Sequence, residues 1–364
     1  MGPQVTEDVS AEALARFDMV IDVRSPAEFA EDHLPGAVNL PVLSNEERAE
    51  VGTIYVQESR FKARRIGAAH VARNVARHLE TALADKPGGF KPLVYCWRGG
   101  MRSNAMAHIL AQVGWRTTVL AGGYRTWRRH VTARLYDGAL NLDFVLLDGH
   151  TGSAKTELLG LIAERGLQTL DLEGLAAHRG SLFGALKDRP QPSQKLFESR
   201  LLAALDDLDP ARLVVAEAES SKIGERILPP ALWARLAAAP RIELSAGQAE
   251  RARYLVEAYR DIIADRPALE EAFRRLPVHP SRRRLEGWRA LADAGRFADL
   301  AGAVMELHYD PAYDRSRRKH ERPLVGCIAL DPSDPADRAR AADETVAVIG
   351  ALDAGAAGRE SERR

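Results

Sequence analysis

Cysteine is scarce in this sequence of 364 residues, and long apolar runs are absent. Two cysteines, Cys96 and Cys327, are too few for a disulfide framework, and the chain lacks the CxxC and HExxH motifs of zinc sites. No apolar run approaches the ~18–20 residues that cross a bilayer, and the N-terminal stretch lacks the basic start and apolar core of a signal peptide. Because 51 basic residues balance 51 acidic ones, the net charge of the whole chain does not indicate a polyanionic partner. Such a partner would have to bind to a local basic patch. These absences argue against a membrane protein, a secreted disulfide scaffold and a zinc module, and they favour a cytoplasmic enzyme.

Short apolar runs alternate with helix-patterned stretches along most of the chain, which is typical of α/β domains with parallel sheets. Helices are predicted over the charged segment 46–84 and over 249–307, where apolar residues recur at three- and four-residue spacing. Six apolar runs are predicted as strands: 18–23, 91–96, 116–122, 142–149, 212–219 and 240–246.

The length of the chain favours two domains, and a break at residues 136–141 marks the boundary between them. We predict an N-terminal α/β domain over 1–138, and a second α/β domain over 139–350 that ends in a helical, basic part. The last residues, 351–364, are small and charged, and we predict a flexible tail there.

The first motif with chemical meaning is a cysteine that opens a glycine-rich loop. The strand KPLVYC delivers Cys96 into the loop CWRGGMRS, and a helical run follows. Such a loop directs successive backbone N–H groups toward an anion, and Arg98 and Arg102 lie close in sequence, so both features favour thiolate over thiol. We predict Cys96 as a catalytic thiol; the alternative is a buried structural thiol, which is what Cys327 in its apolar run is predicted to be. The loop predicted to hold a persulfide, a perselenide or an oxyanion comprises Trp97, Arg98, Gly99, Gly100 and Arg102.

The second motif is a P-loop pattern with one departure. The pattern is glycine, four residues, then Gly-Lys-Ser/Thr between a strand and a helix. Gly149, Lys155 and Thr156 are in register, but Ala154 replaces the second glycine and is expected to alter the loop where backbone approaches the ligand. The alternative is a glycine-rich turn that binds no phosphate. The predicted diphosphate-binding residues are Gly149, Thr151, Gly152, Ser153, Lys155 and Thr156.

A partner for Mg²⁺ is expected at the end of another strand. Glu217 and Glu219 end the strand predicted over 212–219, where nucleotide hydrolases more often have aspartate. They are candidates to ligate Mg²⁺ or to lie just behind it, with the hydroxyl of Thr156. The alternative is that both are solvated charges at a strand end.

Residues 22–29 (DVRSPAEF), residues 33–37 (HLPGA) and the loop from Cys96 to Arg102 resemble the rhodanese family over about residues 10–135. This rhodanese-like region is followed by the P-loop motif and by four further segments in a fixed order. With these features together, the chain resembles the tRNA 2-selenouridine synthase family along nearly its whole length. The further segments are LDLEGLAAHRGSLFG (170–184), PSQKLFES (192–199), EAESSKIGERILP (217–229) and LHYDPAYDRS (307–316).

This resemblance implies a rhodanese-like domain, a P-loop NTPase-like domain and a transferase that replaces sulfur by selenium at C2 of the wobble 2-thiouridine of tRNA. It also implies two stages, in which geranyl diphosphate alkylates the sulfur and selenophosphate then supplies selenium while geranylthiol leaves. The P-loop, with Lys155 and Mg²⁺, would hold the diphosphate, and Cys96 would accept or position selenium. His178, Arg179 and Ser181 are expected to shape the same site, or else to end a helix. No tightly bound cofactor and no membrane partner are expected, whereas the enzyme that makes selenophosphate is an expected partner.

A tRNA partner predicts a basic surface. Residues 272–323 contain 12 Lys/Arg and 7 Asp/Glu, a local net charge of +5, with Trp288, Tyr309 and Tyr313 interspersed. Single-stranded loops are bound by charge together with stacking, although an ordinary solvated helix face has the same appearance. The predicted tRNA contacts are Arg282, Arg283, Arg284, Arg317, Arg318 and Lys319.

Three other functions fit parts of the sequence. A P-loop NTPase or small-molecule kinase regulated by a sulfur-relay domain would turn over nucleotide without tRNA. A binding protein that uses the rhodanese fold only for contacts would not need Cys96. An enzyme of the same family that mainly geranylates tRNA would look the same in sequence. The lining of the apolar slot that geranyl needs is not evident from the sequence.

Overall fold

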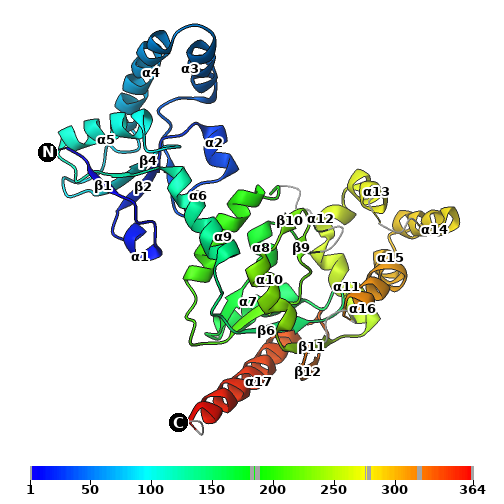
Figure 1. The fold of residues 1–364 in the computed structure, drawn as a ribbon. Coiled ribbons are helices and arrows are strands. Elements are labelled where there is room, and N and C mark those ends of the chain that lie inside the picture. Colours follow the sequence, from blue (N-terminus) through cyan, green and yellow to red (C-terminus); the bar gives the residue numbers. More distant parts are fainter. Residues whose placement is uncertain are drawn as a thin grey trace. The chain divides into compact units, whose positions relative to one another are not determined.

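A computed structural model describes residues 2–180, 184, 189–274, 276, 280–317 and 322–361 of the chain. Tertiary contacts divide the chain into two units, Met1–Gly138 with Pro192–Asp206 and Ala139–Gln191 with Asp207–Arg364. Both units contain a parallel sheet with helices (Figure 1), so the predicted α/β fold class is confirmed. Within the described ranges, no helix is both long enough and apolar enough to span a membrane.

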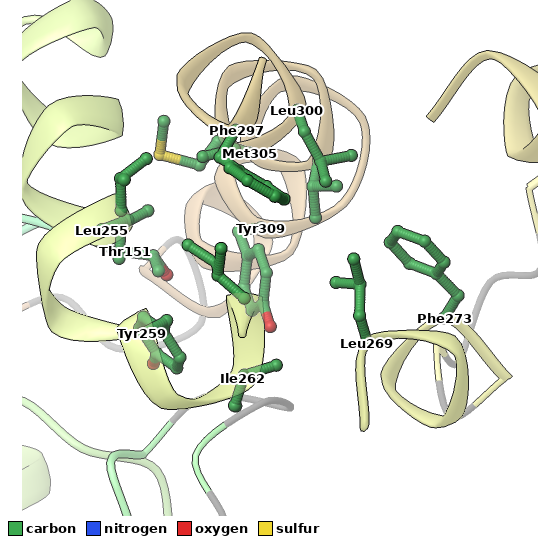
Figure 2. Close-up of a pocket in the computed structure, with 14 residues that line it drawn as sticks. Thr151, Leu255, Tyr259, Ile262, Leu269, Phe273, Phe297, Leu300, Met305 and Tyr309 are labelled. Carbon is green, nitrogen blue, oxygen red and sulfur yellow. The ribbon is translucent and has the colours of Figure 1, made fainter. Parts of the chain in front are cut away.

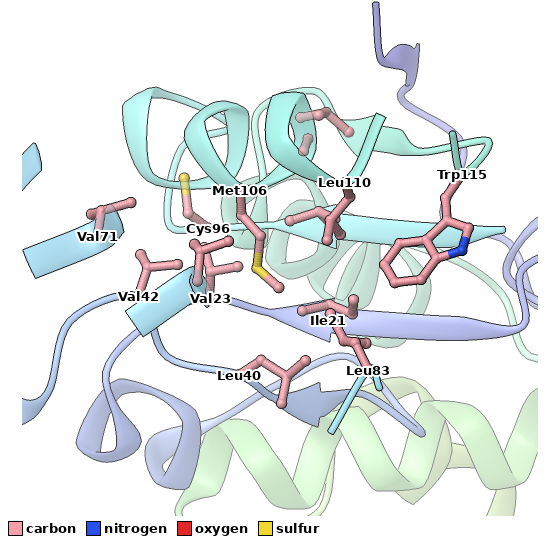
Figure 3. Packing of buried hydrophobic residues seen from close by; sticks show 14 of the residues in the cluster. Ile21, Val23, Leu40, Val42, Val71, Leu83, Cys96, Met106, Leu110 and Trp115 are labelled. Carbon is pink, nitrogen blue, oxygen red and sulfur yellow. The ribbon is translucent and has the colours of Figure 1, made fainter. Parts of the chain in front are cut away.

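The first unit is built on a five-stranded parallel sheet in the order β1-β5-β4-β2-β3. Apolar residues of these strands pack with α5 into a core that contains Ile21, Met106 and Leu110 (Figure 3). The strands are β1 (Gln4–Thr6), β2 (Met19–Asp22), β3 (Val38–Asn39), β4 (Pro92–Tyr95) and β5 (Thr118–Leu120). The helices are α1 (Ala11–Leu14), α2 (Pro26–Glu31), α3 (Asn45–Gln57), α4 (Arg60–Glu80), α5 (Met101–Val113), α6 (Tyr124–Thr132) with its π-helical extension η1 (Ala133–Asp137), and α9 (Gln194–Asp206).

Two charged residues of the DVRSPAEF segment are buried in this unit. The Arg24 guanidinium lies 2.6 Å from the Asp22 carboxylate, and both side chains are almost fully enclosed. Arg24 also lies over the Tyr124 ring, 4.2 Å from its centroid. A buried charge is tolerated only when it is paired and hydrogen-bonded, so this pair fastens the turn that follows β2 to α6. Asp22 and Arg24 therefore act in the fold.

Helix α9 differs from the predicted domain division, which placed all of 139–350 in the second domain. The structure places α9 with the first unit, because its polar side chains bond to α6. The indole N–H of Trp127 donates to the Ser199 hydroxyl at 3.0 Å, and Arg128 pairs with the buried Glu198. Contacts of this kind join segments far apart in sequence and leave no signal in local periodicity.

The second unit has a five-stranded parallel sheet in the order β12-β11-β6-β8-β7, and the short antiparallel pair β10-β9. Helices α7 and α17 contribute to one apolar cluster with this sheet, whereas α13, α14 and α15 form a separate helical cluster. The strands are β6 (Phe144–Asp148), β7 (Gln168–Leu170), β8 (Val214–Glu217), β9 (Lys222–Ile223), β10 (Arg226–Ile227), β11 (Arg241–Ser245) and β12 (Leu324–Ala329). The helices are α7 (Lys155–Glu164), α8 (Leu172–Ala176), α10 (Pro230–Ala238), α11 (Gln248–Ala258), α12 (Arg260–Ile263), α13 (Arg266–Arg274), α14 (Arg282–Asp293), α15 (Phe297–Val304) with π-helical η2 (Met305–Tyr309), α16 (Asp310–Arg317) and α17 (Pro335–Ser361).

All six predicted strands form, each within two residues of its predicted ends. One expectation near the C-terminus differs from the structure. The prediction that Cys327 is a core residue is wrong, because β12 lies at the edge of the sheet beside β11 and the Cys327 side chain is exposed. Helix α17 extends to Ser361 and so includes most of the segment 351–364, and the flexibility predicted for that segment stays a prediction. The alanines of this segment have the highest helix propensity, which favours such an extension.

Candidate active site

Cys96 directly follows β4, at the carboxyl end of a strand inside the parallel sheet. The loop continues from Cys96 to Gly100, and Gly100 is the N-cap of the 13-residue helix α5. The side chain of Cys96 is 3% exposed and borders the apolar core, and Figure 3 shows its sulfur directed away from Val23 and Val42. Ligands of open α/β sheets bind outside the carboxyl ends of the strands, so the position of Cys96 suits a binding or catalytic thiol.

A second glycine-containing turn holds the Cys96 loop in place. The backbone N–H of Tyr124 donates to the Cys96 carbonyl at 2.8 Å. At Gly123, with φ of +57°, a Cβ atom would lie 2.1 Å from the same carbonyl oxygen, and at Gly99, with φ of +65°, it would lie 2.8 Å from the Gly122 nitrogen. Only glycine allows backbone segments to approach this closely. Gly123 is therefore needed for the loop geometry, and sequence analysis did not single it out.

The polar neighbours of Cys96 differ from those expected from sequence. The Arg102 guanidinium pairs with the Glu28 carboxylate at 2.7 Å, and Arg98 is exposed. The group that does contact the sulfur is the buried hydroxyl of Ser103, at 3.2 Å from Sγ. Ser103 lies in the first turn of α5, one residue beyond the predicted loop. A donor at this position stabilises negative charge on the sulfur.

The P-loop lies between β6 and α7, as the sequence predicted. A Cβ atom at Gly149 would lie 2.6 Å from the Ser153 hydroxyl, and one at Gly152 would lie 3.0 Å from Leu255 of α11. Lys155 donates from Nζ to the Gly149 carbonyl at 3.0 Å and so closes the loop. The loop thus has the geometry of a phosphate cradle with its lysine in place.

An arginine from α11 supports this loop from outside the motif. Arg251 donates to the Thr151 carbonyl at 3.1 Å and pairs with Asp310 of α16 at 2.8 Å. Its side chain is buried, and a buried guanidinium requires such partners. The Ser153 hydroxyl is buried as well, and among the described residues it has no hydrogen-bond partner. This hydroxyl is therefore available to a ligand in the loop.

Ala154, which replaces the second glycine of the P-loop pattern, adopts a left-handed backbone conformation with φ of +56° and ψ of +35°. Glycine takes this conformation freely, whereas an L-residue takes it at a cost of roughly 1–2 kcal/mol. The Ala154 side chain is buried. Ala154 therefore keeps the left-handed backbone conformation that glycine would adopt in the motif, and its methyl group makes that conformation strained.

Replacing Ala154 with glycine is therefore expected to stabilise the second unit. We expect a gain of about 0.5–1 kcal/mol, because relief of the left-handed strain exceeds the extra entropy of glycine in the unfolded chain. Thermal denaturation should then shift upward by about 2 °C. The matched control is Ala163→Gly at an exposed position of α7, which should shift the transition downward. A downward shift for Ala154→Gly as well would show that the loop is not strained.

Two carboxylates, one on the buried Glu217 and one on the half-buried Glu173, meet the hydroxyl that follows the P-loop lysine. The Thr156 Oγ1 atom lies 2.6 Å from Glu217 Oε1 and 3.0 Å from Glu173 Oε2. Burial, together with the charge of Glu219, raises the pKa of Glu217 to about 8. Burial, together with Glu217 and Glu219, raises the pKa of Glu173 to about 10. Glu173 stands in the LDLEG segment that the resemblance singled out, but sequence analysis did not assign it to the site.

The P-loop opens into a cavity of about 760 Å³ that is lined by polar and charged groups. Its lining includes Lys155, Thr156, Glu173 and Glu219. It also includes four arginines: Arg179, Arg241, Arg317 and Arg322. The Nε atom of Arg322 is buried and, among the described residues, has no hydrogen-bond partner. One lysine and four arginines thus share the lining with four carboxylates, including Asp148 and Glu157, and this mixture suits a phosphate-bearing ligand that binds together with a cation.

An apolar pocket of about 90 Å³ adjoins this cavity (Figure 2). Four residues line both spaces: Thr151, Leu255, Tyr259 and Tyr309. The rest of its lining is apolar and comes from α11, α12, α13, α15 and η2, including Ile262, Leu269, Phe273, Phe297, Leu300 and Met305. The side chains of Leu255, Tyr309 and Leu300 surround a common space in Figure 2. Sequence analysis identified no apolar pocket in this part of the chain.

The predicted tRNA contacts are in different surroundings. Arg282, Arg283 and Arg284 are exposed at the start of α14, and Arg282 pairs with Glu286 at 3.0 Å. Arg317 pairs with Glu243 of β11 and lines the P-loop cavity. Arg318 and Lys319 lie outside the described residues.

Of the aromatic residues among these arginines, Trp288 is only 5% exposed and packs near Phe273 in the helical cluster. It is therefore not available to stack on a base. Tyr309 and Tyr313 line the P-loop cavity, and the Tyr313 hydroxyl bonds to Asp148.

The AHRGS segment lies partly at the cavity. Arg179 pairs with Asp261 at 3.1 Å, and its guanidinium lies over the Tyr259 ring at 5.0 Å from the centroid. Burial lowers the pKa of His178, and its Nδ1 atom has no hydrogen-bond partner within the described part of the chain. Ser181 lies outside the described residues. Arg179 therefore lines the site, while no contact with the P-loop is seen for His178.

These folds and sites define a rhodanese-like domain joined to a P-loop domain. Family models agree: one described as a rhodanese-like domain matches residues 6–130, and one described as the tRNA 2-selenouridine synthase AAA domain matches residues 142–273. The tRNA 2-selenouridine synthase of Hahella chejuensis (strain KCTC 2396) is 33% identical over 336 residues, which cover 87% of this chain and 83% of that protein. The chain belongs to the tRNA 2-selenouridine synthase family.

Other relatives match a shorter part. The tRNA 2-selenouridine synthase of Cupriavidus pinatubonensis (strain JMP 134 / LMG 1197) is 37% identical over 250 residues, which cover 66% of this chain and 65% of that protein. Among solved structures, the N-terminal domain of a protein from Clostridium difficile 630 is 35% identical, with a TM-score of 0.30, and its match covers 34% of this chain and 97% of that one.

Proposed function

We propose that this protein is a transferase that replaces sulfur by selenium at C2 of the wobble 2-thiouridine of tRNA. Geranyl diphosphate and selenophosphate are its small-molecule substrates. Support comes from the relatives, which are named tRNA 2-selenouridine synthase, and from the presence of both a P-loop cavity and a Cys96 loop. The observation that carries the use of geranyl diphosphate is the shared lining of the polar cavity and the apolar pocket.

A geranyl diphosphate molecule has two ends of opposite chemistry, and the second unit offers a matching surface for each. The diphosphate would lie against the P-loop, near Lys155 and Ser153, and the hydrocarbon chain would pass over Leu255 and Tyr309 into the apolar pocket. A cavity of about 150 Å³ takes benzene, so a pocket of about 90 Å³ holds only part of a ten-carbon chain. The remaining carbons would lie along the four shared residues. A nucleotide has no comparable hydrocarbon end.

The residues beside the P-loop suit Mg²⁺. Thr156 and Glu217 would hold the ion, with Glu173 and Glu219 close to it, and one Glu217 oxygen, Oε2, has no hydrogen-bond partner among the described residues. No group of three or more His, Cys, Asp or Glu side chains suited to a metal occurs among the described residues. Mg²⁺ commonly uses one or two carboxylates plus phosphate oxygens and water, so fewer protein ligands suffice. The ion would neutralise charge on the diphosphate oxygens.

In the first stage, the thiocarbonyl sulfur of the base attacks C1 of the geranyl group. The bond from C1 to the diphosphate oxygen breaks, and diphosphate leaves with the electron pair, while N3 of the base loses its proton to water. Lys155, held by the loop, stabilises the charge that develops on the leaving group. This step transfers a prenyl group and needs no hydrolysis of a nucleotide.

In the second stage, the selenium atom of selenophosphate attacks C2 and the carbon–sulfur bond breaks. Water then takes the phosphoryl group from selenium and phosphate leaves, while N3 of the base and the departing geranyl sulfur each take up a proton. Alkylated sulfur departs as geranylthiol, a better leaving group than the original thiocarbonyl sulfur. Cys96, with Ser103 bonded to its sulfur, would position selenium at the loop of the first unit. The amides at the N-terminus of α5 favour an anion there.

The test is mass spectrometry of nucleosides from 2-thiouridine tRNA incubated with the pure protein. Geranyl diphosphate is added first and selenophosphate second. We expect the geranylthio nucleoside after the first addition and the seleno nucleoside after the second. Consumption of ATP or GTP with unchanged tRNA would contradict the proposal and would favour a regulated NTPase.

The assignment of the apolar pocket is tested by filling it. Ala301 of α15 lines the pocket, and Ala301→Leu would place three further carbons where the geranyl chain is proposed to lie. We expect the affinity for geranyl diphosphate to fall at least tenfold, while that for inorganic diphosphate stays within about twofold, because lost apolar contact costs about 0.8 kcal/mol per CH₂. Isothermal titration calorimetry measures both. Ala298→Leu, at an exposed position of α15, is the matched control. Equal loss for both ligands would place the hydrocarbon chain elsewhere.

A further inference from the structure

Helices α3 and α4 of the first unit form a hairpin that sequence analysis did not assign to any function. They lie side by side in Figure 1 and pack along their length. The buried positions of α4 are four residues apart: Ala63, Gly67, Val71 and Val75. At Gly67 a Cβ atom would lie 3.4 Å from Val51 of α3, so the two helices approach closely. One side of α4 is therefore used by the fold.

The opposite side of α4 is strongly basic. Residues 60–80 contain six Lys/Arg and one Asp/Glu, a net charge of +5 in 21 residues. At 100° per residue, Lys62, Arg65 and Arg73 lie opposite the buried stripe, and Arg77 lies beside them. All four are exposed. They extend over roughly 22 Å of helix, at about 1.5 Å per residue.

These charges are largely unneutralised. Lys62 pairs with Glu58 at 2.5 Å, and Arg73 contacts the His70 ring, whose nitrogens also lie near the carboxylates of Glu47 and Glu50. Arg65 and Arg77 have no ion pair with any described carboxylate. The positions between them on this side are Ala69, Ala72 and Ala76, which are exposed and small. A ligand backbone can therefore approach the helix closely between the basic side chains.

The end of the hairpin adds exposed apolar surface to the charge. Val56 is 82% exposed, Phe61 is 77% exposed and Tyr55 is 44% exposed. The Arg60 guanidinium lies over the Tyr55 ring at 5.6 Å from the centroid. Exposed aromatic rings beside arginines are the combination that binds unpaired bases. An acidic protein would match the charge but would have no specific use for the rings.

We propose that the exposed face of α4 and the end of the α3–α4 hairpin bind RNA. The basic side chains contact the phosphate backbone, and Tyr55 and Phe61 stack on unpaired bases. This inference rests on the proposed function for the identity of the RNA as tRNA. It assigns tRNA binding to the first unit, in addition to the arginines of α14 predicted from sequence.

The experiment measures binding of unmodified tRNA to the full chain by fluorescence anisotropy, without geranyl diphosphate or selenophosphate, over about 50–300 mM KCl. The variant R65Q/R73Q/R77Q removes three charges from α4. We expect its affinity at the lowest salt to fall at least tenfold, and the slope of log K against log salt to decrease by about two to three. The matched control is R16Q/K91Q/R116Q. It removes three exposed charges that lie just before β2, β4 and β5 and outside α4, and it should leave the slope of log K against log salt unchanged. Circular dichroism of each variant checks that the fold is kept.

A second variant separates stacking from charge. Y55A/F61A should lower the affinity for tRNA at least fivefold with an unchanged salt slope, because stacking involves no counterion release. If wild type and R65Q/R73Q/R77Q bind tRNA with the same affinity and the same salt slope, the inference is overturned. The basic face of α4 would then favour an acidic protein as its partner. If the wild-type protein binds no tRNA at all, the proposed function fails together with the inference.

Discussion

Replacing Lys155 with alanine is expected to lower the rate of tRNA geranylation by about 10²–10³-fold, the loss seen when one preorganised charge-stabilising group is removed. Lys155 lines the P-loop cavity and closes the loop through its bond to the Gly149 carbonyl. In the proposed first stage, Lys155 would balance the charge on the departing diphosphate. Single-turnover mass spectrometry of the geranylthio nucleoside measures the rate.

The control for Lys155→Ala is Lys222→Ala, which removes an exposed lysine from β9 in the same unit. It should geranylate at the wild-type rate. Lys155→Ala should still incorporate selenium when it is supplied with tRNA that already carries the geranylthio group. A Lys155→Ala protein that geranylates normally would show that the P-loop does not hold the diphosphate.

Replacing Cys96 with alanine is expected to block the second stage and spare the first. The change removes the sulfur that accepts a hydrogen bond from Ser103 at 3.2 Å. The seleno nucleoside should form at least about 10²-fold more slowly, the usual contribution of one positioned catalytic group. The geranylthio nucleoside should accumulate to the wild-type level, because no residue of the P-loop has changed. Mass spectrometry of both nucleosides over time follows the two stages separately.

Cys327→Ala is the matched control, because Cys327 is the other cysteine of the chain and is exposed on β12. It should leave both stages unchanged. The melting temperature of Cys96→Ala should stay near that of wild type, since one small buried atom is lost. Normal selenation by Cys96→Ala would restrict Cys96 to the structural role that sequence analysis kept as the alternative.

The two glycine-rich loops of the chain differ in the ligand chemistry that they suit. In both, a central parallel strand ends at a loop that leads into a helix N-terminus, which favours an anion. In the first unit the loop begins with a thiol and is tied to Gly123. In the second it ends with Lys155 and Thr156 beside two carboxylates. The first arrangement suits sulfur or selenium, and the second suits a diphosphate with Mg²⁺.

The α/β fold class, six of the twelve strands found among the described residues, and both loops follow from the sequence alone. These features depend on interactions between residues close in the chain: apolar runs form strands, and glycines with lysine or cysteine mark the loops. The local pattern is therefore sufficient to place Cys96 and Gly149 directly after strands, and Lys155 and Thr156 at the start of the helix that follows. The same local reasoning misplaced Cys327, because an apolar run does not distinguish an inner strand from an edge strand.

Which distant residues meet was decided by the tertiary structure. It joined Glu173 and Glu217 at the Thr156 hydroxyl, brought Arg251 to the P-loop carbonyl and placed α9 against α6. It assembled the apolar pocket from five helical segments that are spread over more than fifty residues of the chain. It buried Trp288 and exposed Phe61, although both are aromatic residues close to arginines in sequence. Burial and proximity depend on packing between segments far apart in the chain, and local sequence patterns contain no record of that packing.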